Sequence, residues 1–136
     1  MAQFNYRIAD DKFWENINTD FDNGGGVYEL YCSMSNKEII PICRLLKEDE
    51  NGTLYIGKAD SFLDRVIELK KSISLTSSNH ECGVRYKESD VIKEKFPYEN
   101  LYVKLTGSDD PRLLETKKLD DYIKEFGEVP PLNRMG

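Results

Sequence analysis

The sequence predicts a small α+β domain, in which helices flank a mainly antiparallel β-sheet. Two stretches, 61–73 and 111–126, repeat apolar residues at the spacing of an amphipathic helix. Stretches 26–32, 53–57 and 100–106 are rich in β-branched and aromatic residues or alternate apolar with polar ones, which is typical of strands. The order along the chain is helix, three short strands, helix, strand, helix, and this order favours an α+β fold.

The first predicted helix covers residues 11–21. Phe13, Trp14, Ile17 and Phe21 fall on one face of it. Glycines 24–26 end this helix, and they serve either as a hinge or as backbone that passes close to another group. A chain of 136 residues is expected to be a single domain, in which residues 1–25 form an N-terminal helical extension and residues 26–134 form the core.

Three strands are predicted next, at 26–32, 38–46 and 53–57. Pro41 makes the second of them an edge strand or a bulge, because proline cannot donate to a ladder. The hydrophilic segment 47–52 ends in Asn51-Gly52, which is a strong hairpin signal.

The second half of the chain carries the remaining elements. A helix begins at Asp60 or Ser61 and ends near Ile73, a polar loop covers 74–79, and a short helix at 91–96 precedes Pro97. A strand at 100–106 leads to the last helix, 111–126. That helix starts after Asp109-Asp110 with a proline in its first turn and ends before Gly127.

The net charge of −6 argues at first sight against a nucleic-acid partner. The charge is uneven, however. Residues 1–50 hold five Lys and Arg against ten Asp and Glu, whereas residues 58–104 hold nine against eight. A local cationic groove for phosphate therefore remains compatible with the composition.

The three cysteines are odd in number and show no C-x-x-C spacing, which predicts a reduced, cytoplasmic protein. His80-x-Cys82 is too sparse for a zinc site, which needs about four ligands. No apolar run approaches ~18 residues, so no membrane span is predicted.

Some polar and aromatic residues break the pattern of a plain structural domain. Glu115 falls on the apolar stripe of its helix, where it is either a first-turn charge that suits the helix dipole or an inward carboxylate that binds a metal. Arg65 is either an i,i+3 partner of a glutamate or a functional cation. Core packing alone explains Tyr28 and Tyr55, and turn chemistry alone explains Asn133.

Taken together, these residues resemble a known family. Gly26-Val27-Tyr28, followed by Tyr55-Ile56-Gly57-Lys58, resembles the paired motifs of the GIY-YIG nuclease superfamily, with Val in place of Ile in the first motif. Arg65, Glu115 and Asn133 follow in the order of the family arginine, metal-binding glutamate and C-terminal asparagine. The resemblance spans roughly residues 26–134.

Two departures from the family pattern stand out. The two motif tyrosines are 27 residues apart, so an extra strand and an acidic turn lie between them. Many family nucleases also have a His or Tyr one turn after the arginine, where this chain has Leu69. His80 is a candidate substitute for that residue, and a structural or surface role explains it equally well.

The resemblance implies a metal-dependent endonuclease that hydrolyses phosphodiester bonds in DNA with one Mg²⁺ or Mn²⁺ ion. It implies that Glu115 holds the metal, Arg65 binds phosphate, and Tyr55 positions water or phosphate. Tyr28 is the candidate general base, its pKa lowered by the metal and nearby cations. The implied site is Tyr28, Tyr55, Lys58, Arg65, Glu115 and Asn133.

The alternative is a catalytically weak or inactive module of the same fold that binds nucleic acid or a protein partner. Leu69 and the acidic N-terminal third favour this second hypothesis. For the endonuclease the expected partner is nucleic acid, specifically DNA, and no membrane partner is expected. The chain has little beyond the nuclease-like core, which predicts weak sequence specificity or an accessory specificity subunit.

Overall fold

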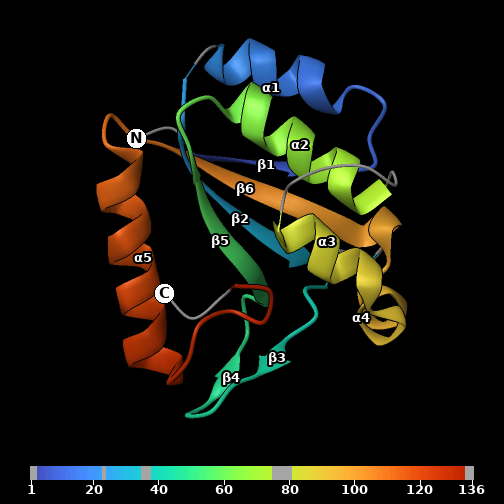
Figure 1. Cartoon of the computed structure of the whole chain (residues 1–136), viewed down its shortest axis with the longest axis vertical. Coiled ribbons are helices and arrows are strands. Elements are labelled where there is room, and N and C mark those ends of the chain that lie inside the picture. Colours follow the sequence, from blue (N-terminus) through green and yellow to red (C-terminus); the bar gives the residue numbers. More distant parts are fainter. Residues whose placement is uncertain (1–2, 23, 35–37, 75–80, 134–136) are drawn as a thin grey trace.

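The computed structural model describes residues 3–22, 24–34, 38–74 and 81–133. Its centre is a four-stranded antiparallel sheet with the order β1-β6-β2-β5 (Figure 1). These strands are β1 (Gln3–Arg7), β2 (Gly26–Cys32), β5 (Thr53–Ala59) and β6 (Leu101–Gly107). The predicted α+β class, an antiparallel sheet flanked by helices, is confirmed.

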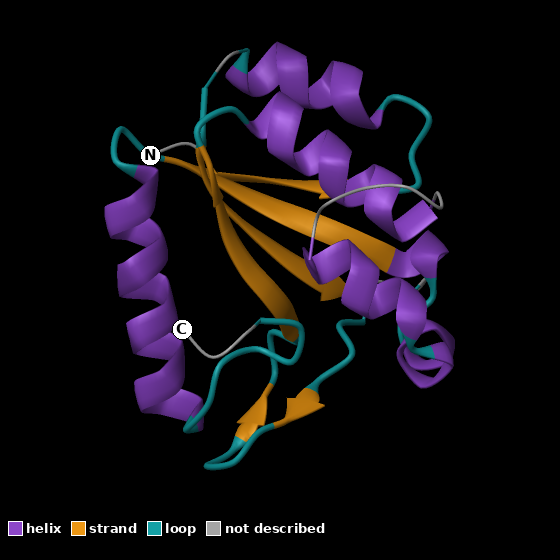
Figure 2. Ribbon diagram, in the orientation of Figure 1, coloured by secondary structure: helices purple, strands orange, loops and turns teal. Residues whose placement is uncertain are grey.

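Helices cover the sheet from two sides, as Figure 2 shows. Helices α1 (Phe13–Phe21), α2 (Phe62–Ser74) and α3 (Glu81–Glu88) contribute to the main core, together with Tyr28 and Leu30 of β2. On the opposite face, α5 (Pro111–Phe126) packs Tyr122 and Phe126 against Val27 and Ile56. Because successive strand residues point to opposite faces, Val27 and Tyr28 belong to different cores.

The N-terminal segment contains more than the predicted helix. Strand β1 pairs with β6 along its whole length, so residues 3–7 belong to the sheet and are not part of a purely helical extension. The sequence alternates here, with Phe4 and Tyr6 between polar residues. Tyr6 is buried in the main core, and this tertiary contact gives such a short strand its place.

The predicted strand at 38–46 is wrong in its extent. Only β3 (Ile42–Cys43) is a strand here, and it pairs with β4 (Glu48–Asp49) as a separate two-stranded hairpin. Pro41 interrupts the run, as proline removes a ladder donor. The Asn51-Gly52 turn connects β4 to β5, with Gly52 at φ 59°.

The helix α3 was not predicted from the sequence. It buries Cys82 and Tyr86, which are four residues apart on one side of the helix. The predicted loop at 74–79 lies outside the described residues apart from residue 74, the last of α2. His80 also lies outside them. Beyond α3 lie α4 (Asp90–Lys95) and the short 3₁₀ helix η1 (Tyr98–Asn100).

The last helix is confirmed together with its caps. The Asp110 carboxylate accepts a hydrogen bond from the Leu113 N–H at 3.2 Å, and Pro111 occupies the first turn. At the other end Gly127 adopts the left-handed conformation, and its N–H bonds the Ile123 carbonyl. These caps fix where α5 starts, and therefore where Glu115 sits in its first turns.

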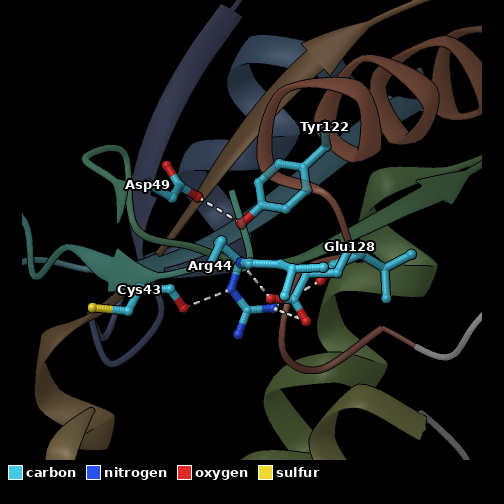
Figure 3. Close-up of polar contacts among 7 residues, drawn as sticks. Cys43, Arg44, Asp49, Tyr122 and Glu128 are labelled. Atoms are coloured by element: carbon cyan, nitrogen blue, oxygen red, sulfur yellow. Dashed lines mark hydrogen bonds and ion pairs between the residues drawn. The ribbon is translucent and has the colours of Figure 1, made fainter. Parts of the chain in front are cut away.

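The hairpin β3–β4 is fastened to the C-terminal end of α5 (Figure 3). Arg44 donates to the Val129 carbonyl at 3.0 Å and lies 3.4 Å from the Glu128 carboxylate. The Tyr122 hydroxyl donates to Asp49 at 2.8 Å. Asp49 is buried and also accepts the backbone N–H groups of residues 51 and 53. The hairpin β3–β4 therefore supports the C-terminal end of α5.

Candidate functional site

Five of the six residues singled out from the sequence line one open pocket of about 460 Å³. It lies where β5 ends, α2 begins and the first turns of α5 pass by. The chain brings together residues that are up to 87 positions apart: Tyr28, Tyr55, Lys58, Arg65 and Glu115. The sixth, Asn133, lies behind the pocket.

Two glycines make this arrangement sterically possible. A Cβ on Gly25 would lie 2.2 Å from the Ala59 carbonyl oxygen, so the chain entering β2 passes directly against the end of β5. A Cβ on Gly57 would lie 2.6 Å from ring atoms of both Tyr28 and Tyr55. The glycine of the second motif therefore leaves the space that the two phenol rings occupy.

The two tyrosines form a pair on the main-core face of the sheet. Their ring centroids are 5.8 Å apart with a tilt of 37°. Burial raises the pKa of both hydroxyls above the usual value for tyrosine, and that of Tyr28, whose side chain is fully buried, is raised far above it. The hydrogen bond between them raises the pKa of Tyr28 further but lowers that of Tyr55. In the chain alone, Tyr55 is thus the better placed of the two to lose its proton.

Arg65 projects from the first turns of α2 into the pocket. Its guanidinium donates to Glu68 at 2.9 Å and also hydrogen-bonds the Tyr28 hydroxyl. Its positive charge acts on both tyrosines and lowers their pKa values, against the larger effect of burial. Arg65 is therefore the i,i+3 partner of a glutamate, as one alternative from the sequence had it, and it also lines the pocket.

Glu115 turns inward from α5. Its carboxylate accepts a hydrogen bond from the backbone N–H of Lys58 at the end of β5. Partial burial raises the pKa of Glu115, and the positive charges of Lys58 and Arg112 counteract part of that rise. The carboxylate therefore lies beside the end of β5.

Asn133 holds the strand that carries Tyr55. Its side-chain oxygen accepts the Ile56 N–H and its amide nitrogen donates to the Ile56 carbonyl, both at 2.9 Å. One residue earlier, the Leu132 N–H donates to the Leu54 carbonyl at 2.8 Å. Residues 132 and 133 thus satisfy the free edge of β5 on both sides of Tyr55, while Arg85 of α3 donates to the Leu132 carbonyl.

Sequence reasoning missed three carboxylates of the pocket, which are Asp60, Asp64 and Glu68. Asp64 and Glu68 lie four residues apart on α2 and flank Arg65, and this spacing was a usable signal. Leu69 is buried in the main core, so no polar group takes the place of the family His or Tyr there.

The pocket has the donor types that a hydrated divalent cation needs. Its lining holds four carboxylates and two cationic side chains, a formal charge of −2 at neutral pH. Among the described residues, no three His, Cys, Asp or Glu side chains are grouped closely enough to enclose a metal ion. Mg²⁺ commonly uses one or two carboxylates and keeps several waters, so the chemistry of the lining fits that ion.

Comparison of the chain with protein-family models, with curated proteins and with solved structures found no match. Within the described part of the chain, every helix is too short or too polar to cross a lipid bilayer.

Proposed function

We propose that the protein is a metal-dependent endonuclease that hydrolyses phosphodiester bonds in DNA. The observation that carries the proposal is the convergence of Tyr28, Tyr55, Lys58, Arg65 and Glu115 on one open pocket. Four separate elements supply these side chains, and the resemblance to GIY-YIG nucleases implies a role for four of them, Tyr28, Tyr55, Arg65 and Glu115.

The charge of the pocket explains why the proposed reaction requires a metal. Four carboxylates against two cations repel a phosphodiester, and a divalent cation cancels the formal charge of −2. Glu115 is the proposed ligand, because its carboxylate is held in place by the Lys58 N–H. When bound, Mg²⁺ acts as a Lewis acid toward the phosphoryl oxygens.

The remaining side chains orient phosphate and handle a proton. The planar guanidinium of Arg65 can donate two hydrogen bonds to the phosphate once its hydrogen bond to Glu68 is broken. The coupled Tyr28 and Tyr55 hydroxyls are the proposed proton acceptors. Tyr28 is the base that the family resemblance implies, whereas the hydrogen bond between the hydroxyls favours a phenolate at Tyr55. Asn133 is a positioning residue for β5.

The proposal is tested by incubating purified protein and supercoiled DNA with Mg²⁺ or Mn²⁺. We expect nicking or cleavage that Glu115→Ala and Arg65→Ala each abolish. Asp120→Ala on α5 and Lys71→Ala on α2 are matched controls, because both side chains are exposed outside the pocket, and we expect them to keep full activity. Equal activity in all five proteins would identify a contaminating nuclease and end the assignment. Tyr28→Phe and Tyr55→Phe then show which hydroxyl the rate depends on.

A second candidate function is a module that keeps the fold and binds nucleic acid or a protein without turnover. The burial of Leu69 in the core and the raised tyrosine pKa values favour it. Metal binding should raise the unfolding temperature of either protein, and Glu115→Gln should erase that rise. Metal binding without DNA cleavage would select the module. For the endonuclease, we further propose low intrinsic sequence specificity or an accessory specificity subunit.

A further inference from the structure

One half of the sheet is left uncovered on the face where α5 packs. Helix α5 covers β2 and β5 through Val27 and Ile56, and among the described residues no helix packs over β1 and β6 on that side (Figure 1). The register of the strands places six side chains of β1 and β6 on this face, and Thr106 is the buried one among them. Together with Tyr31 of the neighbouring β2, the other five form what we call the open sheet face: Gln3, Asn5, Arg7, Tyr31, Tyr102 and Lys104.

Two tyrosines form the middle of the open sheet face. Tyr31 of β2 and Tyr102 of β6 are direct register partners, with ring centroids 5.6 Å apart and planes within 20° of parallel. The Tyr31 hydroxyl reaches across β6 and donates to the Asn5 side chain on β1 at 3.0 Å. This hydrogen bond holds the ring across the sheet surface. Both rings are partly exposed and already ordered, so a ligand that stacks on them pays little entropy.

Positive charge is concentrated beside these rings. The ammonium groups of Lys104 and Lys118 lie 3.6 and 3.4 Å from the same Glu29 oxygen, so they are within about 7 Å of each other. Arg7 is the register partner of Tyr102 on the outer strand. These four charged residues sum to +2 in a chain whose net charge is −6. The pair of lysines keeps an unmatched positive charge that a phosphate group would complement.

Partly exposed aromatic rings beside positive charges favour one class of ligand, single-stranded nucleic acid. Bases of a single strand expose their faces for stacking on aromatic side chains, and a lysine-lined surface follows the phosphates. A duplex keeps its bases stacked inside, and an acidic peptide offers charge without base faces. Asp121 and Glu125 line the depression on the far side of Lys118, which confines an anionic strand to β6 and β1.

We propose that the open sheet face binds single-stranded nucleic acid, with bases stacked on Tyr31 and Tyr102 and phosphates at Lys104, Lys118 and Arg7. The surface is separate from the pocket of Glu115 and Arg65, and binding there does not depend on the proposed hydrolysis. It assigns a function to the one part of the sheet that neither the pocket nor a helix uses.

The test titrates the protein into a fluorescently labelled oligothymidylate of about 12 nucleotides and follows its anisotropy. This length is within the usual site size of single-strand-binding surfaces. EDTA is present so that metal-dependent hydrolysis does not interfere. Tyr102→Ala should weaken binding about tenfold, as the loss of one stacked base does. Lys104→Gln should weaken it and reduce the slope of log affinity against log salt by about 0.7. The matched controls are Trp14→Ala on α1 and Lys71→Gln on α2, which remove an exposed aromatic ring and an exposed charge away from the open sheet face. Both variants should bind the oligonucleotide as the wild type does.

Several outcomes would overturn the inference. These are absence of oligonucleotide binding, equal losses in the variants and the controls, and equally effective competition by duplex DNA or by polyglutamate. If Tyr102→Ala does not fold, as judged by thermal unfolding, the salt slope of Lys104→Gln still decides. Loss of binding on Arg65→Ala but not on Lys104→Gln would place the strand in the pocket. That result would refute this inference and leave the proposed hydrolysis intact.

Discussion

Replacing Gly57 by alanine is the sharpest test of how the two motif tyrosines are packed. The new methyl group would lie 2.6 Å from Cζ of Tyr28 and from Cε2 of Tyr55, whereas ordinary contact begins at 3.4 Å. Both rings must therefore give way, each by about 0.8 Å. Tyr28 is fully buried and has no room to retreat, and Tyr55 can move only by disturbing its hydrogen bond to Tyr28.

The expected cost follows from overpacking in a well-packed core, which is about 1–3 kcal/mol. A value near 2 kcal/mol lowers the Tm of a chain this long by roughly 6–10 °C. Thermal and urea unfolding of wild type and Gly57→Ala measure the loss. The same substitution in a Tyr28→Leu background should cost less, because leucine lacks both Cζ and the hydroxyl. An unchanged Tm, or an equal loss in both backgrounds, would refute the packing that we describe.

Three further predictions address the pocket and the strand behind it. Because burial raises the pKa of Tyr28, the unfolded chain loses this proton above about pH 10 while the native chain keeps it. Tyr28 alone should therefore lower the free energy of unfolding by up to about 1.4 kcal/mol per pH unit there. Other tyrosines with raised pKa values, such as Tyr6 and Tyr122, add to the fall, so Tyr28→Phe should lessen its slope without abolishing it in urea titrations between pH 8 and 11. Asn133→Ala removes two hydrogen bonds to Ile56, so it should lower the free energy of urea unfolding by about 1–2 kcal/mol. A loss below about 0.3 kcal/mol, which is within experimental error, would contradict the role of these bonds. Glu68→Gln frees Arg65 from a half-exposed ion pair, so calorimetry should find phosphate bound about two- to fivefold more tightly, and weaker binding would contradict the competition.

The local sequence pattern was sufficient to predict an element wherever its end signals and its apolar spacing lie within the element itself. Helix α5 has a cap at Asp110, a proline in its first turn and a glycine after its last, and each signal acts within a few residues. The strand β6 alternates buried and partly exposed residues along most of its length. In such elements the local and the global preferences agree, so the sequence predicts them correctly.

Prediction failed where the partner of a segment is distant in sequence. The run 38–46 reads as one strand, but Leu45 and Leu46 are 74% and 64% exposed. The Leu46 N–H instead donates to the Phe126 carbonyl at the end of α5. In α3, Gly83 weakens the local helix signal, and burial of Cys82 and Tyr86 in the core outweighs it.

The candidate site was likewise predictable from the sequence only in part. The residue types and their order could be taken from the sequence, but the inward position of Glu115 depends on a backbone N–H at Lys58, 57 residues away. Periodicity within α5 places Glu115 on the apolar stripe, but it does not decide between an inward carboxylate and a first-turn charge that faces water. The carboxylates of Asp60 and Glu68 likewise become part of the pocket only through the way α2 leaves the end of β5.

The β3–β4 hairpin, which lies between the two motif tyrosines in the sequence, contacts the helix that carries Glu115. Helix α5 carries Glu115 near its start and is held at its other end by Asp49, which is buried and accepts three hydrogen bonds, one of them from Tyr122. A buried carboxylate with three donors is costly to disturb, because each donor would be left without a partner. The inserted hairpin therefore fixes the position of α5 against β2 and β5, and through that helix it sets where Glu115 meets the end of β5.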